Sequence, residues 1–227
     1  MAIHDYLQPA NKGKQVWQTL ASNLTSGTHP YNVKGFCAAL VAQWLLEIHF
    51  AAGARPDELG RYLLQGRLGA HGYGGIASSQ RIYGSLNPEM NNHSALIHRH
   101  TGGSLARGHE IQINSHEHCW RLVREKIYND HSLDDALPPG RHARVYSAYL
   151  GLYGTFSWPL SWLAGNGWGH AIGLHSDGVR IYIFDPNYGV FIFHSEAPEV
   201  MANFFRDLWD QYRATSGNFA RVKSLCE

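Results

Sequence analysis

A histidine and an aspartate stand on either side of a predicted β-hairpin in the last third of the chain. His170 and Asp185 flank the dipeptide Asp177-Gly178, and the runs between them are rich in apolar, β-branched and aromatic residues. Asp-Gly between such runs is typical of a two-residue hairpin turn. With Asp177 and Gly178 as the loop, His170 lies directly opposite Asp185, with Cβ atoms roughly 4.5–5.5 Å apart. We therefore expect the carboxylate to orient the imidazole, as in a catalytic relay.

The same pair also has a purely structural interpretation, in which His and Asp satisfy each other's hydrogen bonds at a strand edge. The face that they share is expected to continue through four apolar residues that alternate as in half-buried strands: Ile172, Leu174, Ile181 and Ile183. A catalytic role for the polar pair therefore depends on a nucleophile elsewhere in the chain.

Cys37 is the candidate nucleophile. It begins a predicted helix that extends to about residue 52, because apolar residues recur at helical spacing without Gly or Pro until Gly53. A thiol at a helix N-terminus is favoured as the thiolate by the helix dipole and by unpaired backbone N–H groups. The alternative is a buried cysteine that only extends the apolar stripe. His170 follows Cys37 by 133 residues, within the spacing of about 130–150 residues found in papain-type enzymes.

An acyl-transfer site also needs donors for the oxyanion that forms during the reaction. Asn32 stands five residues before Cys37, where papain-type sites place a side-chain amide donor, and the backbone N–H of Cys37 would be the second donor. Asn is common in any turn, so Asn32 alone is a weak signal.

Length and composition predict one folded domain over residues 1–227. The formal net charge of +1 gives no reason to expect nucleic acid as a partner. The chain has three cysteines, a small and odd number that does not suit a disulfide framework and indicates a reducing compartment. The N-terminus lacks the apolar core of a secretory signal peptide, and no run is long and apolar enough for a membrane span.

Periodicity predicts an α+β fold, with helices first and an antiparallel sheet later. We expect strands over 143–153 and 190–194, and an edge strand over 219–225. A divergent, irregular or helical insertion is expected over about 66–140. Helices are expected over five segments besides the one that begins at Cys37: 14–24, 56–65, 76–83, 116–128 and 198–212.

Three sequence blocks resemble the YopT/AvrPphB family of bacterial cysteine proteases, which are papain-like effectors. The blocks are N-x-x-G-F-C-A-A-L-V-A-Q-W-L around Cys37, G-H-A-I-G-L around His170 and I-F-D-P-N-Y-G-V-F around Asp185. The matched parts cover residues 31–50 and 168–225. The resemblance implies a papain-like fold and a Cys37–His170–Asp185 triad with Asn32 as oxyanion donor. It also implies a cysteine endopeptidase that works through a thioester acyl-enzyme, with no cofactor and no metal.

The same resemblance implies partners and a place of action. The substrate would be a host protein, such as a small GTPase or a kinase, and the protein would act as a monomer without nucleic acid or stable membrane insertion. It would reach the host cytoplasm through a bacterial secretion system, without a cleaved signal peptide. Only 36 residues precede Cys37, which leaves little room for a self-cleaved pro-region.

Other functions remain open from the residues alone. The same triad could serve a deamidase, a transglutaminase or an acyltransferase, because it attacks amides generally. The aromatic group Trp158, Trp162 and Trp168 could line a substrate groove or pack beneath the sheet. A structural zinc site could draw on His93, His98, His100, His109, His116, His118 and Cys119. The spacing disfavours zinc, because His116 and His118 point in different directions on a helix.

Overall fold

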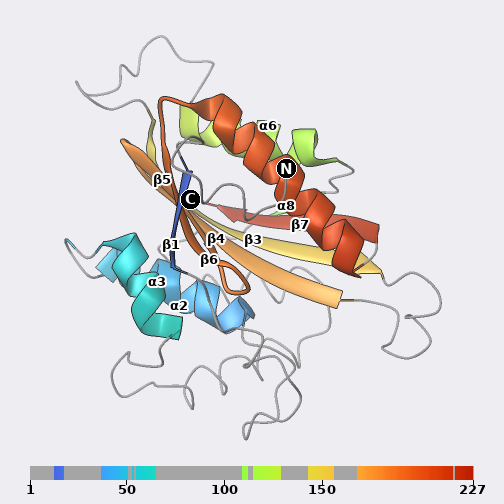
Figure 1. Cartoon of the computed structure of the whole chain (residues 1–227), viewed down its shortest axis with the longest axis horizontal. Helices are drawn as coiled ribbons and strands as arrows, with labels where there is room; N and C mark the ends of the chain where they lie inside the picture. The colour runs from blue at the N-terminus through green and yellow to red at the C-terminus, as the bar shows by residue number, and fades with distance from the viewer. Residues whose placement is uncertain are drawn as a thin grey trace, which may run out of the picture.

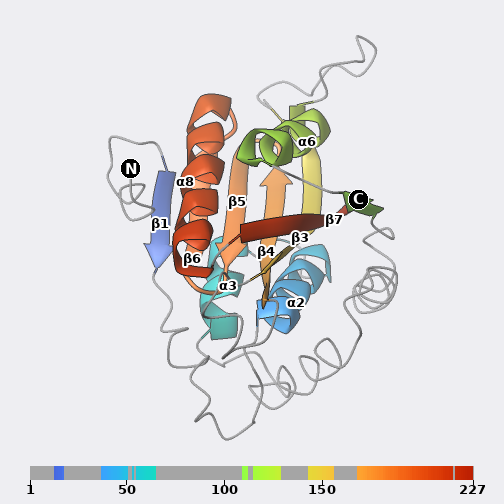
Figure 2. The same ribbon diagram turned by 90° about the vertical axis from the view of Figure 1, so that its right-hand side faces the viewer.

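The computed structural model describes residues 13–17, 37–50, 53, 55–64, 109–111, 115–128, 143–155, 168–216 and 218–226. In these ranges an antiparallel sheet of seven strands runs in the order β1-β6-β5-β4-β3-β7-β2. Helices α2 and α3 cover one face of this sheet, and α6 and α8 cover the other (Figure 1, Figure 2). The fold is therefore α+β, as predicted. The strands are β1 (Gly13–Trp17), β2 (His109–Ile111), β3 (Val145–Thr155), β4 (Trp168–Asp177), β5 (Arg180–Asp185), β6 (Gly189–His194) and β7 (Asn218–Cys226).

The helices begin and end where local signals place them. Helix α2 (Cys37–Phe50) is followed by Gly53 at a positive φ of 82°, which favours glycine. Helix α3 (Pro56–Leu64) begins with proline and two acids, which suit the first turn. Helix α6 (His116–Tyr128) is capped by the Ser115 hydroxyl, which accepts a 3.2 Å hydrogen bond from the His118 N–H. With α8 (Pro198–Ser216), these elements confirm four of the predicted helices.

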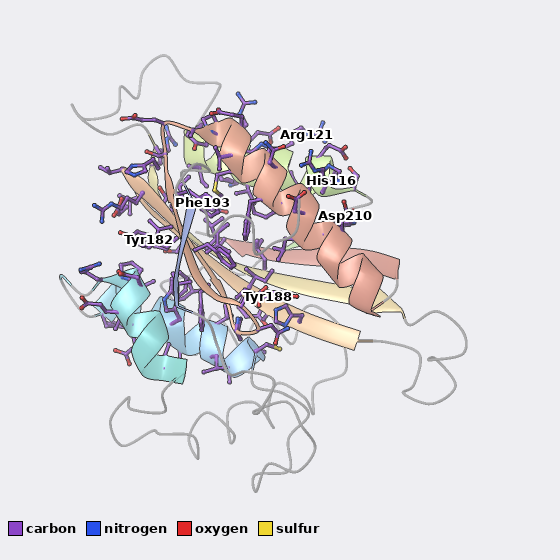
Figure 3. All side chains as sticks on the ribbon, viewed as in Figure 1. His116, Arg121, Tyr182, Tyr188, Phe193 and Asp210 are labelled. Atoms are coloured by element: carbon purple, nitrogen blue, oxygen red, sulfur yellow. The ribbon has the colours of Figure 1, made fainter. Side chains whose placement is uncertain are left out.

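Each face of the sheet packs its own core. On one side, apolar residues of β3–β6 meet those of α6 and α8, and Phe193 belongs to this side. On the other side, Tyr182 and its neighbours meet α2 and α3. Figure 3 labels these two residues on their strands. The alternating residues predicted to share one face, Ile172, Leu174, Ile181 and Ile183, all lie in the core against α6 and α8.

Three predictions about elements were wrong. Residues 13–17 form strand β1, not the start of a helix, because they pair with β6. Strand β7 is not an edge strand, since it pairs with β3 on one side and with β2 on the other. Within the predicted irregular insertion, β2 is a regular strand.

A fourth error concerns the register of the central hairpin. Ser176 pairs with Ile181 and Gly173 with Phe184, so Gly178 and Val179 form the loop instead of Asp177 and Gly178. Gly178 has a positive φ of 95°, which the first position of a type II′ loop requires. Asp177 lies before the loop, and its Oδ1 accepts hydrogen bonds from the Val179 and Arg180 N–H groups at 2.9 and 2.7 Å. The aspartate therefore fixes the turn through its side chain.

Several predictions lie outside the described residues, among them the helix over 76–83 and most of the insertion. The single domain over 1–227 stays a prediction for the same reason. Among the helices described, none combines the length and the apolar character that a bilayer span requires.

Candidate active site

His170 and Asp185 form a buried pair. His170 Nε2 lies 2.9 Å from Asp185 Oδ1, and both residues are buried. The expected contact is present although the expected register is not. The observed register, if continued, sets Asp185 opposite Ile172, two residues from His170. A shift of two residues leaves every side chain on its original face, so the pair meets diagonally instead of directly.

A tight turn holds the Asp185 carboxylate in place. Residues 186–188 form the loop between β5 and β6, and Asp185 pairs with Gly189 across it. The Tyr188 N–H donates to the Asp185 carbonyl at 3.0 Å, and the Asn187 N–H donates to Asp185 Oδ1 at 2.8 Å. Gly189 has a positive φ of 106°. The sequence D-P-N-Y-G thus builds a three-residue loop in which proline presets the backbone and glycine closes it.

Cys37 is the first residue of α2 and is partly exposed. Its thiol hydrogen-bonds to the His170 side chain and to backbone groups of Ala171 and Ala38. Since His170 Nε2 faces Asp185, Nδ1 is the ring nitrogen that can form the hydrogen bond with Cys37. The structure thus brings together three of the four predicted site residues. The fourth, Asn32, lies outside the described residues.

The electrostatics of the site favour a thiolate next to an imidazolium. Burial raises the pKa of the Cys37 thiol, but the hydrogen bond and charge of His170 and two backbone contacts outweigh it, so the pKa is lowered. Burial lowers the pKa of His170, but the Asp185 charge, the hydrogen bond to that carboxylate and the contact with Cys37 together raise it to about 10. A partly exposed cysteine whose pKa is lowered in this way is a candidate nucleophile for carbonyl carbon.

Sequence reasoning missed the backbone of Ala171 as a partner of Cys37. It also missed Gly173, where a Cβ atom would lie 2.6 Å from the Trp44 ring. An isolated glycine inside a strand is a known signal of close approach by another element. In G-H-A-I-G-L, that signal was available at the second glycine.

The candidate zinc ligands that the structure describes do not form a metal site. No group of three His, Cys, Asp or Glu in the described ranges lies close enough to hold a metal ion. His116 Nε2 lies 3.1 Å from Glu117 Oε1, and Cys119 is buried in the core against α8. His93, His98 and His100, like Trp158 and Trp162, lie outside the described residues.

The chain is similar to known proteins in part of its sequence and in its fold. Residues 158–225 match the Peptidase C58 family model, described as Yersinia/Haemophilus virulence surface antigen. The crystal structure of the Pseudomonas avirulence protein AvrPphB is similar, with a TM-score of 0.54 at 17% sequence identity, covering 91% of this chain and 98% of that one. PatoxP, a cysteine protease-like domain of the Photorhabdus asymbiotica toxin PaTox, gives a TM-score of 0.43 at 18% identity, over 98% of this chain and 57% of that one. No curated protein sequence matches the chain.

The matched segment contains His170 and Asp185 but not Cys37, which lies in the first part of the chain. The structural similarity extends over 91% of this chain and is therefore not confined to the matched C-terminal segment. The chain thus has the papain-like α+β fold of AvrPphB, and its C-terminal third confirms the resemblance to the Peptidase C58 family, to which YopT and AvrPphB belong.

Proposed function

We propose that this protein is a cysteine endopeptidase of the YopT-like effector type, which cleaves a host protein. The observation that carries this proposal is the position of Cys37 at the N-terminus of α2, in a hydrogen bond with His170. The imidazole in turn faces a fully buried carboxylate at 2.9 Å. A nucleophile, a base and a group that orients the base are the three parts that acyl transfer by a thiol requires.

In the proposed reaction, the Cys37 thiolate attacks the carbonyl carbon of the scissile peptide bond and forms a C–S bond. The resulting oxyanion accepts hydrogen bonds from the Cys37 N–H and from Asn32. The His170 imidazolium then gives its proton to the leaving nitrogen as the C–N bond breaks, leaving a thioester. His170 next takes a proton from water, whose oxygen attacks the thioester, and the free thiolate returns when the acid product leaves. Asp185 keeps the ring oriented throughout.

The proposed substrate is a host protein, such as a small GTPase or a kinase, and the proposed place of action is the host cytoplasm after bacterial secretion. We propose that the protein acts as a monomer without cofactor or nucleic acid. These proposals rest on the resemblance to bacterial virulence proteins.

The test is to incubate the wild-type protein and Cys37→Ala with host-cell lysate and to identify new peptide N-termini across the proteome. We expect new N-termini in one or a few proteins with the wild type and none with Cys37→Ala. Circular dichroism of both proteins controls for folding. If the wild type releases ammonia or transfers an acyl group without cutting any chain, a deamidase, transglutaminase or acyltransferase replaces the protease.

A further inference from the structure

We propose that the contact between the Trp44 indole and the bare Cα of Gly173 sets the position of α2 along β4, and with it the alignment of Cys37 and His170. Trp44 and Gly173 are thus positioning residues for the nucleophile. The inference rests on the proposed function only in taking Cys37 as the reactive thiol.

One stripe of α2 faces β4. Cys37, Val41 and Trp44 are spaced at i, i+4 and i+7, so they lie on the same side of the helix. The thiol of Cys37 contacts the backbone of Ala171, and the next residue on the same face of β4 is Gly173. Val41 and Trp44 are fully buried in this contact. The position of the thiol at one end of the stripe therefore depends on the packing at the other end.

Gly173 is the point of closest approach. A Cβ atom there would lie 2.6 and 2.8 Å from two ring carbons of Trp44 and 3.3 Å from Val41 Cγ1. Ordinary contact begins at about 3.4 Å, so any side chain would have to separate helix and strand by about 1 Å. Only glycine permits the observed distance.

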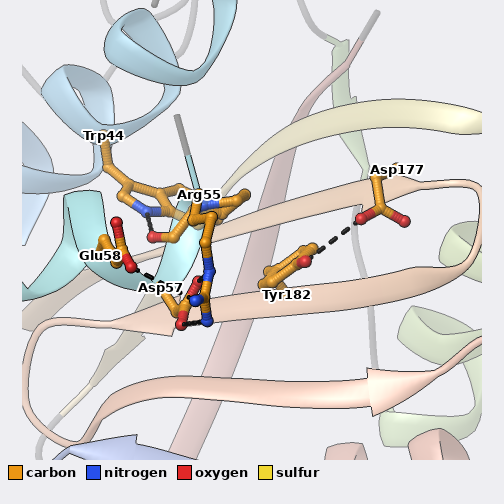
Figure 4. Close-up of polar contacts among 7 residues, drawn as sticks. Trp44, Arg55, Asp57, Glu58, Asp177 and Tyr182 are labelled. Carbon is orange, nitrogen blue, oxygen red and sulfur yellow. Dashed lines mark hydrogen bonds and ion pairs between the residues drawn. The ribbon is translucent and has the colours of Figure 1, made fainter. Parts of the chain in front are cut away.

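The indole has little freedom to turn away from such a side chain. Its Nε1–H donates a 2.8 Å hydrogen bond to the Pro56 carbonyl at the start of α3. Its ring packs on Phe184 of β5, with centroids 5.4 Å apart. Figure 4 shows Trp44 in this position, between α2 and the sheet. Because the ring is held on two further sides, a group added at Gly173 displaces the helix together with the ring.

The displacement would act on the reactive thiol. Cys37 is a favoured thiolate only while His170 and the backbone of Ala171 are within hydrogen-bonding distance. A movement of about 1 Å is enough to lower the rate of an enzyme about a hundredfold when it disturbs the reacting geometry. We therefore expect Gly173→Ala to weaken the thiolate without touching any reacting group.

The experiment measures the pH dependence of alkylation of Cys37 by iodoacetamide, read by mass spectrometry of the Cys37 peptide. In Gly173→Ala we expect the midpoint to rise by about one pH unit and the rate at pH 6 to fall about tenfold. Trp44→Phe removes most of the ring edge that faces Gly173, so the double variant should return to the midpoint of Trp44→Phe alone.

Leu174→Ala is the matched control, because the Leu174 side chain is buried in the opposite core against α8. It should lower the melting temperature and leave the alkylation midpoint unchanged. A folded Gly173→Ala with the wild-type midpoint overturns the proposal, as does a double variant no better than Gly173→Ala. If Gly173→Ala does not fold, the double variant decides, since a folded double variant whose midpoint lies about one pH unit above that of Trp44→Phe alone overturns the proposal.

The readout needs no substrate, so it is independent of the proposed protease activity. A raised midpoint in Gly173→Ala together with a wild type that cuts no protein supports the positioning role and rejects the endopeptidase. Normal cleavage by the wild type together with an unchanged midpoint in Gly173→Ala supports the endopeptidase and rejects the positioning role.

Discussion

His170 is held between a carboxylate and a thiol, and each partner changes what the imidazole can do. The Asp185 charge and the contact with Cys37 outweigh burial and raise the pKa of the ring to about 10. The same contact lowers the pKa of Cys37 despite burial. Both shifts therefore favour the thiolate and the imidazolium over the neutral pair, whereas a hydroxyl-based triad must generate its nucleophile during the reaction.

The charged pair predicts a bell-shaped pH profile for kcat/KM. Activity should fall on the acid side as the lowered pKa of Cys37 is crossed, because the thiolate takes up a proton. It should fall on the alkaline side as pH approaches about 10, because His170 loses the proton that the leaving group needs. The two limbs belong to the coupled pair. A profile that rises steadily through pH 8 to 10 would contradict the ion pair.

The same shift links stability to pH. The charged form of His170 is favoured in the folded state, so its contribution is complete below the usual pKa of 6.5 and is lost as pH rises towards about 10.

Asp185→Asn separates orientation from charge. The amide can keep a hydrogen bond to the ring, but it removes the charge that raises the pKa of His170. We expect kcat/KM to fall roughly ten- to a hundredfold and the alkaline limb to move to lower pH. Loss as complete as in Cys37→Ala would show that the charge itself is indispensable. The measurement is cleavage of the substrate identified in lysate across pH 5 to 10.

At the scale of elements, the turn after β5 is what delivers the carboxylate. Its loop residues bond back to Asp185 through the N–H groups of Asn187 and Tyr188, and Gly189 completes the loop at a φ of 106°. The Asp185 oxygen that contacts His170 Nε2 is thus also held by the backbone of its own loop. The loop is local in sequence, which explains why D-P-N-Y-G indicated the site so directly.

Gly189→Ala should disturb this loop. Alanine at a left-handed position costs about 1–2 kcal/mol, so the free energy of unfolding in urea should fall by that amount and the activity should fall with it. Gly53→Ala is the matched control, because Gly53 also has a positive φ, of 82°, with nothing within 4 Å of an added Cβ. It should show a similar loss of stability with unchanged activity. Equal loss of activity in both variants would contradict a specific role for the loop.

The elements also show which features a sequence can predict. Helix α2 was predictable because its apolar residues repeat over 14 residues without a break. Strand β1 was not, because five residues fit either period and the choice is made by pairing with β6, far along the chain. The predicted hairpin register was wrong for a local reason. The Asp177 carboxylate accepts hydrogen bonds from the loop, and the loop lies one residue later, at Gly178 and Val179. The contact between His170 and Asp185 was still predicted correctly, because a register shift of two residues leaves both side chains on the same face of the sheet.

At the scale of the whole molecule, the sheet joins segments from both ends of the described chain. Strand β1 closes one end of the strand order, and β7 lies between β3 and β2 near the other. The position of β7 could not be read from its sequence, because edge and interior strands differ in their partners more than in their residues. The meeting of Cys37 with His170 was predicted only through spacing and the family resemblance, since packing between α2 and β4 leaves no local signal beyond Gly173.

Removal of β7 should therefore affect the whole sheet. A chain that ends at residue 217 leaves β3 and β2 without their shared partner, and exposed strand edges promote aggregation. We expect most of this protein in the insoluble fraction, whereas a chain that ends at residue 226 should remain soluble and alkylate normally at Cys37. A soluble, folded protein without β7 would show that the interior position is dispensable.

The order of the strands has a consequence for synthesis. The thiol leaves the ribosome early, at residue 37, but its base and the orienting acid follow only at residues 170 and 185. The sheet that supports them also waits for residues 218–226. A growing polypeptide consequently carries a cysteine without its base until residue 170 has emerged, and without its complete supporting sheet until residues 218–226 follow.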